Sequence, residues 1–158
     1  MGNYNVSATL HQGSSHWTIE AEDFYAIGGG AVKRQKVSTG SGPVEHNAFE
    51  VANISDGSTL VYPHVYSRNE KMQLRVVYSN GGTSTGNALF ILQGLGKPYA
   101  TCRLAPTGSW DTYVALDCGG ASRFGANTQT GMMPDVSFNF TGPDTEFARI
   151  DAFSWQIY

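Results

Sequence analysis

Two glutamates near the start of the chain, Glu20 and Glu22 in the stretch IEAED, stand two residues apart. In an extended strand, residues i and i+2 point to the same face, so the two carboxylates lie side by side and repel each other. Either water at an exposed edge or a hard cation neutralises such a pair, and Ca²⁺ accepts about six to eight oxygen ligands. A third acid, Asp151, interrupts the apolar run ARIDAF near the C-terminus. From the residues alone, a solvated edge and a calcium site remain alternatives.

Two cysteines, Cys102 and Cys118, flank the stretch RLAPTGSWDTYVALD. Its proline, glycine and serine predict a turn between two extended runs. One disulfide closing a loop of this size would stabilise the fold by roughly 3 kcal/mol in the chain-entropy picture. Two buried free thiols are the alternative interpretation.

The elements that must position these residues are predicted to be β-strands, because apolar residues alternate rather than recur at helical spacing. The alternating sets are Leu74, Val76 and Tyr78; Thr112, Val114, Leu116 and Cys118; Val136, Phe138 and Phe140; and Phe153, Trp155 and Ile157. Clusters rich in glycine, serine and asparagine separate these runs, at 28–30, 38–43, 55–58, 79–87 and 141–144. Short strands punctuated by such turns predict an all-β, antiparallel sandwich of the jelly-roll type.

The 158 residues suit one domain with a real core, which we assign to residues 16–158. Residues 1–15 are polar and weakly periodic, so we interpret them as a flexible leader, in part an artificial start, or as an added edge strand. The net charge of −3 argues against nucleic acid as a partner, and no apolar run is long enough for a membrane span. Few charges, many aromatics and two cysteines that could form a disulfide favour a secreted, extracellular protein.

Four short motifs occur in an order and spacing that resemble those of a known family. They are IEAEDF near the start, YSNGG at 78–82, PTGSWDTY at 106–113 and ARIDAF at 148–153. Together they resemble the carbohydrate-binding modules of families 6 and 35. The resemblance implies a β-jelly roll appended to a glycan-active enzyme. It also implies a structural calcium ion held by Glu20, Glu22 and Asp151, with a backbone carbonyl from the stretch VKRQK.

The resemblance also implies a sugar-binding site in the loops at one end of the sandwich. Its aromatic wall falls on Trp110, which follows Gly108 and Ser109 in a turn-rich stretch. A sugar presents an apolar face ringed by hydroxyls, so an aromatic platform with a few polar side chains suits it. A core role for Trp110 is the alternative. The further residues that we expect to border the site are Gln35, Tyr99 and Tyr25.

Two site positions depart from the family pattern. Asn53 stands where a tyrosine or tryptophan is common, and Arg149 stands where an asparagine usually precedes the Ile-Asp of the last motif. A guanidinium binds carboxylates and sulfates through a rigid fork, so Arg149 favours an anionic or chain-terminal sugar. A surface ion pair of Arg149 with Asp144 or Glu146 is the alternative.

We therefore expect a non-catalytic module that binds a polysaccharide or oligosaccharide, as a monomer tethered to a catalytic domain. A glycoside hydrolase or lyase would need two carboxyls about 5–9.5 Å apart across the scissile bond. The acids best placed for that are assigned to the metal, and the others show no recognisable pairing. A β-sandwich adhesion or assembly domain is the third class, in which Trp110 would contact another protein.

Overall fold

The structure is a computed structural model of the 158-residue chain. It describes residues 16–35, 49–62, 70–92, 98–118, 122–124 and 136–157. The leader predicted for residues 1–15 lies outside these ranges. Over the described ranges the chain forms β-strands without a helix, and hence without a helix able to cross a membrane.

The larger sheet has seven strands in the described residues, and its neighbours pair antiparallel in the order β10-β6-β12-β4-β3. In addition, β1 pairs with β12 and β9 pairs with β6. The strands of this sheet are β1 (His16–Glu20), β3 (Val32–Gln35), β4 (Phe49–Ile54), β6 (Glu70–Ser79), β9 (Val114–Asp117), β10 (Ser122–Phe124) and β12 (Ala148–Ile157).

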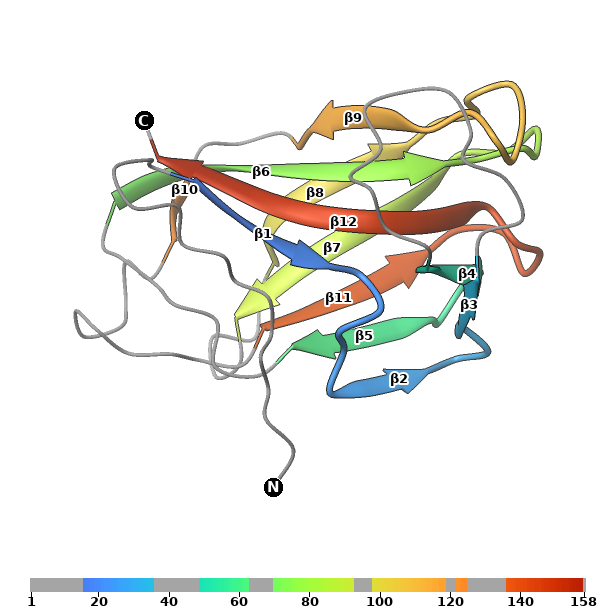
Figure 1. The fold of residues 1–158 in the computed structure, drawn as a ribbon, viewed down its shortest axis with the longest axis horizontal. Helices are drawn as coiled ribbons and strands as arrows, with labels where there is room; N and C mark the ends of the chain where they lie inside the picture. Colours follow the sequence, from blue (N-terminus) through green and yellow to red (C-terminus); the bar gives the residue numbers. More distant parts are fainter. Residues whose placement is uncertain are drawn as a thin grey trace.

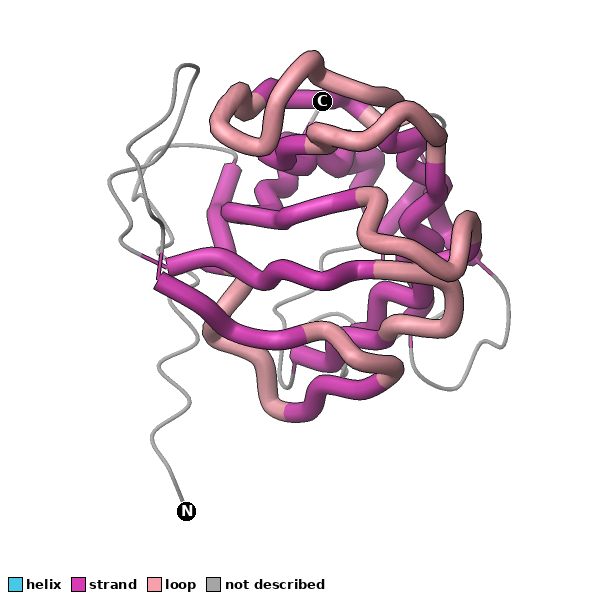
Figure 2. Tube along the Cα trace, turned by 90° about the vertical axis from the view of Figure 1, so that its right-hand side faces the viewer, coloured by secondary structure: helices cyan, strands magenta, loops and turns pink. Residues whose placement is uncertain are grey.

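The smaller sheet has five strands in the described residues, in the antiparallel order β2-β5-β11-β7-β8. They are β2 (Ala26–Gly28), β5 (Thr59–Tyr62), β11 (Val136–Thr141), β7 (Gly86–Leu92) and β8 (Pro98–Leu104). The two sheets form the layers of a sandwich (Figures 1 and 2). The all-β antiparallel sandwich predicted from the sequence is therefore confirmed.

The core lies between the two sheets and follows the predicted alternation. Leu74, Val76 and Tyr78 of β6 are buried, as are the alternate residues of β11. Phe138 of β11 stacks on Phe153 of β12, with ring centroids 3.7 Å apart, so the aromatic contact joins the two layers. Tyr62 of β5 meets both rings edge to face. Such aromatic pairs add specific geometry to the apolar area that they bury.

The last strand, β12, changes its partner halfway along one edge. Its first residues pair with β4, through Ala148 opposite Ile54 and Ile150 opposite Val51. From Ala152 onward the same edge pairs with β1. Asp151 lies at this change, and the register of β12 with β6 also shifts there. A β-bulge of this kind re-aims side chains locally.

A disulfide joins Cys102 of β8 to Cys118, which follows β9. These strands belong to different sheets, so the bond ties the two layers together. The disulfide alternative of the sequence analysis is confirmed. The bond closes the loop that carries Trp110.

Candidate functional site

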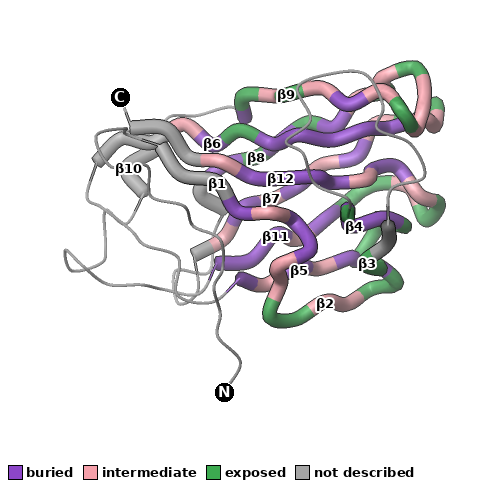
Figure 3. The backbone as a smooth tube through the Cα atoms, in the orientation of Figure 1, coloured by how far each residue is buried: buried purple, intermediate pink, exposed green. Residues whose placement is uncertain are grey.

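Three loops gather at one end of the sandwich. They connect β6 to β7, β8 to β9, and β11 to β12, and Figure 1 shows them together at the right-hand end of the sandwich, beyond the end of β6 and the start of β12. Most of their residues are half-buried or exposed, whereas the strands behind them carry most of the buried residues (Figure 3). Asn80, Tyr113 and Phe147 are the buried residues of these loops. This loop end is where the sequence analysis placed the site.

Asn80, which follows β6, holds the first two loops together and is fully buried. Its carbonyl accepts a hydrogen bond from the Thr107 amide at 2.8 Å, and its own amide donates to Thr107 Oγ1 at 3.0 Å. Its side-chain Nδ2 donates to the carbonyls of Ser84 and Leu104, at 2.9 and 3.0 Å. The amide of Gly82 donates to Asn80 Oδ1. One buried side chain therefore sets the shape of both loops.

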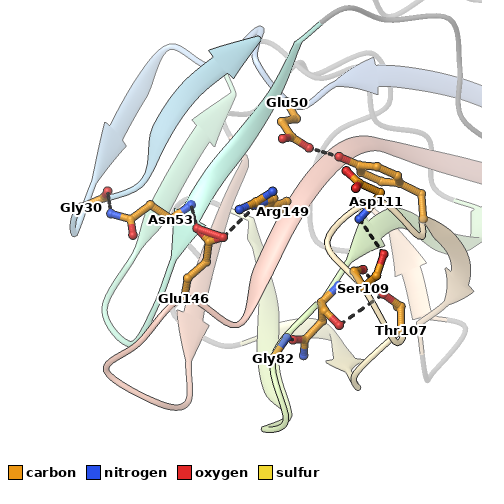
Figure 4. A network of polar contacts seen from close by, with 11 residues as sticks. Gly30, Glu50, Asn53, Gly82, Thr107, Ser109, Asp111, Glu146 and Arg149 are labelled. Atoms are coloured by element: carbon orange, nitrogen blue, oxygen red, sulfur yellow. Dashed lines mark hydrogen bonds and ion pairs between the residues drawn. The ribbon is translucent and has the colours of Figure 1, made fainter. Parts of the chain in front are cut away.

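Trp110 lies in the β8–β9 loop, and its position is set on both sides. Within the loop, Ser109 Oγ accepts from the Asp111 amide at 3.0 Å, and Thr107 Oγ1 donates to the Ser109 carbonyl at 3.1 Å (Figure 4). From the β6–β7 loop, the backbone of Gly81 packs against the indole. A Cβ at Gly81 would lie 2.5 Å from Trp110 Cγ and Cδ1, so only glycine permits this approach. The indole is half-buried, at a loop as predicted.

Arg149, at the start of β12, lies over the ring of Trp110. Its guanidinium carbon is 4.5 Å from the ring centroid, which is a cation–π distance. Its Nε donates to Glu146 Oε1 at 2.8 Å, and the two side chains are 17% and 20% exposed. The ion-pair alternative for Arg149 is thus confirmed, with Glu146 as the partner. The hypothesis that Arg149 binds an anionic sugar stays a prediction. Such a sugar would compete with Glu146 for the guanidinium of Arg149.

Asn53 reaches the same group of residues from β4. Its backbone amide donates to Glu146 Oε2 at 2.9 Å, and its Nδ2 donates to the Gly30 carbonyl at 2.7 Å (Figure 4). Its φ is 58°, in the left-handed region that asparagine tolerates better than most other side chains. These two facts give asparagine a structural reason to stand at a position where the resembling families place an aromatic residue.

Glu146 therefore links Arg149 to Asn53, although from the sequence we expected it only as an alternative partner of Arg149. One of its carboxylate oxygens accepts from Arg149 and the other from Asn53. The predicted residues Trp110, Arg149 and Asn53 are brought together around it. The signal in the sequence was the i,i+3 spacing of Glu146 and Arg149, ahead of the last strand.

A second polar group lies behind the loop end, beside β12. Tyr113, the residue before β9, donates its hydroxyl to Glu50 Oε2 of β4, and both residues are buried (Figure 4). Burial raises the pKa of Tyr113, and the Glu50 carboxylate and the negative charge of Asp151 raise it further. Glu50 was not among the residues singled out in the sequence.

The predicted calcium ligands converge in their backbone positions. Glu20 is the last residue of β1 and pairs with Ala152, and the amide of Ala21 donates to the Asp151 carbonyl at 2.9 Å. Tyr62 Oη donates to the Ala21 carbonyl at 2.6 Å, which fixes the turn from the other sheet. Asp151 is fully buried and Glu22 is 9% exposed. Burying carboxylates is costly unless positive charge meets them, so oxygen-rich surroundings of this kind suit Ca²⁺.

The calcium site itself stays a prediction. Within the ranges that the structure describes, no three His, Cys, Asp or Glu side chains are grouped so that they could hold a metal ion. The backbones of Glu20, Glu22 and Asp151 lie close together, but their carboxylates do not form such a group.

The remaining predicted residues lie away from Trp110 in their backbone positions. Gln35 pairs with Phe49 at the start of β4, about 13 Å along the strand from Asn53. Tyr99 is near the start of β8, whereas the Trp110 loop follows the end of that strand. The side chains of Gln35 and Tyr99 lie outside the described part of the chain. Tyr25 is 57% exposed and precedes β2, whose opposite end leads to Gly30.

No protein-family model matches the sequence, and no curated protein matches it. Solved structures do match in fold. A β-1,3-glucan-binding family 6 carbohydrate-binding module from Bacillus halodurans has a TM-score of 0.71 at 16% identity, over 88% of this chain and 94% of that one. A family 6 module from Clostridium cellulolyticum, in complex with xylose, has a TM-score of 0.67 at 23% identity, over 89% and 96%.

A third structure is a whole enzyme, the glycoside hydrolase family 43 arabinoxylan arabinofuranohydrolase from Bacillus subtilis, in complex with cellotetraose. The TM-score is 0.67 at 21% identity, over 89% of this chain. This chain spans only about a quarter of that enzyme, 26% of its length. At these identities the likeness establishes the fold, which is the β-sandwich of the family 6 carbohydrate-binding modules. The resemblance seen in the four motifs is confirmed at that level.

Proposed function

We propose that this chain is a non-catalytic carbohydrate-binding module whose site is the loop end around Trp110. The observation that carries the proposal is the convergence of Trp110, Arg149 and Asn53 at one end of a sandwich with this fold. The ligand class is a polysaccharide or oligosaccharide. We also propose that the module is extracellular and that it targets an attached glycan-active enzyme, in keeping with the disulfide and with the similarity to part of a family 43 hydrolase.

The chemistry of the loop end suits sugar binding. An indole offers an apolar surface for the C–H face of a pyranose, and nearby polar groups form hydrogen bonds to its hydroxyls. The hydrogen bonds of Asn80, Thr107 and Ser109 fix the loop before any ligand arrives. A preorganised loop loses less conformational entropy on binding, so more of the contact energy appears as affinity.

A binding role fits the acids of the loop end better than catalysis does. A hydrolase needs one carboxyl that gives up a proton and a second across the bond. Glu146 has one oxygen on the Arg149 guanidinium and the other on the Asn53 amide. Asp111 is exposed, in the same loop as Trp110. This arrangement supports a fixed binding surface rather than a proton-transfer pair.

We further propose that a Ca²⁺ ion stabilises the fold near Glu20, Glu22 and Asp151. The burial of Asp151 and Glu22 and the hydrogen bond between Ala21 and Asp151 support this assignment. Bound calcium would supply the positive charge that makes buried carboxylates tolerable, and the residues named would supply oxygen ligands. None of the three proposed ligands lies in the loops around Trp110, so we assign the ion a role in stability rather than in sugar recognition.

The test is a titration against cellotetraose, xylotetraose, laminaritetraose and β-1,3-galactobiose, with a turnover assay on the same sugars. We expect binding without cleavage. Trp110→Ala should lower the affinity by about 2 kcal/mol or more, which corresponds to roughly thirtyfold, while the domain stays folded.

Tyr25→Ala is the matched control, because it removes an exposed aromatic side chain from another part of the surface. We expect it to bind like the wild type. Unchanged affinity in Trp110→Ala would place the site elsewhere, and cleavage of any of these sugars would contradict a non-catalytic role. Failure to bind any sugar or polysaccharide would favour the adhesion class.

A further inference from the structure

The ring of Trp110, which the proposed function uses as a sugar platform, already has a side chain on it. The guanidinium carbon of Arg149 is 4.5 Å from the ring centroid. Carbon atoms in van der Waals contact are about 3.5–4.0 Å apart, so the guanidinium occupies the layer in which a stacked sugar ring would lie. Gly81 lies close to the pyrrole part of the same indole, where a Cβ would be 2.5 Å from Trp110 Cγ and Cδ1.

Glu146 holds Arg149 in this position. Its Oε1 accepts from Arg149 Nε at 2.8 Å, and its Oε2 accepts from the Asn53 amide at 2.9 Å. The Asn53 side chain is in turn bound to the Gly30 carbonyl at 2.7 Å. The carboxylate is therefore anchored on the β4 backbone, and the pair is largely shielded from solvent, with side chains 17% and 20% exposed. Bonds of this charge-assisted kind are short and about twice as strong as neutral ones.

We infer that Arg149 is a cover on Trp110, held closed by Glu146, and that it determines which sugars the site accepts. The inference rests on the proposed function. A neutral pyranose can stack on this ring face only after the guanidinium moves off it, and it offers no charge to replace Glu146. An acidic sugar offers a carboxylate that takes the place of Glu146 on the guanidinium. The cover therefore weakens the binding of neutral glycans relative to acidic ones.

The test measures the affinities of cellotetraose and xylotetraose and of the β-1,4-linked tetraglucuronate that matches cellotetraose. Removing the cover in Arg149→Ala should tighten binding of the neutral sugars by about fivefold, the size of one cation–π contact. The same variant should weaken tetraglucuronate binding. Arg149→Lys keeps the charge without the planar group and should give intermediate values. Glu146→Gln weakens the bond that holds the cover in place, so it should also tighten the binding of neutral sugars, but by less than Arg149→Ala does.

Arg75→Ala is the matched control. Arg75 forms the same kind of pair, with Nε 2.7 Å from Asp117 Oδ1, but on β6 away from the loop end. We expect its sugar affinities to equal those of the wild type. Neutral affinity that falls or stays constant in Arg149→Ala would overturn the inference, while a Trp110-dependent affinity in the wild type would leave the proposed function standing.

A second measurement needs no sugar. If Arg149 covers the indole, acrylamide should quench tryptophan fluorescence more strongly in Arg149→Ala than in the wild type. In the Trp110→Phe background the same substitution should change quenching little. The fluorescence then comes only from the other two tryptophans, which the proposed cover does not involve. Equal quenching of the wild type and Arg149→Ala would overturn the cover even if no sugar of the panel binds.

Discussion

The loop end around Trp110 and the acidic region around Asp151 both include a residue of β12, Arg149 and Asp151 respectively, but the two regions are built differently. At the loop end the negative charge of Glu146 is met by Arg149, and the side chains remain partly exposed. In the acidic region Asp151 and Glu22 are buried, where the turn at Ala21 is bound to both sheets. Only one residue of β12, Ile150, lies between Arg149 and Asp151.

This difference shows how one strand serves two purposes. Arg149 is at the end of β12 that pairs with β4 and meets the loops, whereas Asp151 marks the change of partner from β4 to β1. At the loop end the negative charge of Glu146 is paired with Arg149, so we expect this region to respond to sugars rather than to a cation. The acidic region is rich in oxygen, so we expect it to respond to a cation. Four experiments separate the two regions.

The largest effect should come from the disulfide, which closes the Trp110 loop and lies outside the acidic region. Replacing both Cys102 and Cys118 by serine should cost roughly 3 kcal/mol of unfolding free energy. Denaturant titration measures this loss. Hydrogen exchange should speed up in residues 103–117 more than at the β1–β12 pairing. Uniform acceleration across both regions would argue against their independence.

The next effect should come from calcium. An ion that binds only the folded state, at a hundredfold excess over its dissociation constant, adds about 2.7 kcal/mol of stability. Chelator should therefore lower the melting temperature, and Glu22→Gln should lose most of this response. Glu146→Gln, which changes the acid of the loop end, should keep it. Identical melting with and without chelator, together with the absence of metal on elemental analysis, would remove calcium from the acidic region.

A smaller effect should follow from the contact between Gly81 and Trp110. Gly81→Ala places a methyl group 2.5 Å from the indole, so the ring or the loop must shift, at a cost of about 2 kcal/mol. Sugar affinity should fall while the calcium response stays. In the neighbouring Gly82→Ala the nearest atom, Asn80 Oδ1, is 3.3 Å from the new methyl, so a milder change is expected. Wild-type melting and binding in Gly81→Ala would show that Trp110 is not held by this contact.

The smallest of the four effects tests the residue between the regions. The pKa of Tyr113 is raised by burial and by Glu50, so the folded state keeps this proton at a pH where the unfolded chain releases it. Stability from Tyr113 is therefore full below about pH 10 and falls as the pH rises above that, by about 1 kcal/mol at pH 11. Tyr113→Phe should lose less stability between pH 9 and pH 11 than the wild type. Parallel pH profiles for the two proteins would contradict the raised pKa.

The strands were predictable because their apolar alternation reflects burial directly. Val136, Phe138 and Phe140 alternate in the sequence, and all three are buried in β11. Trp110 was predictable as a loop residue from the Pro, Thr, Gly and Ser before it. In both cases the signal is local, and local chemistry decides the outcome.

The rest depended on strand register, which a single sequence does not reveal. Gln35 and Tyr99 were expected beside Trp110, but their strands place their backbones away from the loop end. Glu146 was not expected to connect the site, because its second partner, Asn53, is 93 residues away. The left-handed conformation of Asn53 likewise follows from its tertiary hydrogen bonds rather than from its neighbours in the chain.

The pairing of β1 with β12 has a mechanical consequence. His16 lies opposite Gln156 and Glu20 lies opposite Ala152, so the outer ends of the first and last described strands are at the same end of the sheet (Figure 1). A pulling force applied between those ends would peel β1 from β12 one residue pair at a time, instead of shearing all the pairs together. The first pairs to separate would be those farthest from the turn at Ala21. The loop end around Trp110 lies beside the start of β12, at the opposite end from Gln156, so it would stay folded through this first step of forced opening.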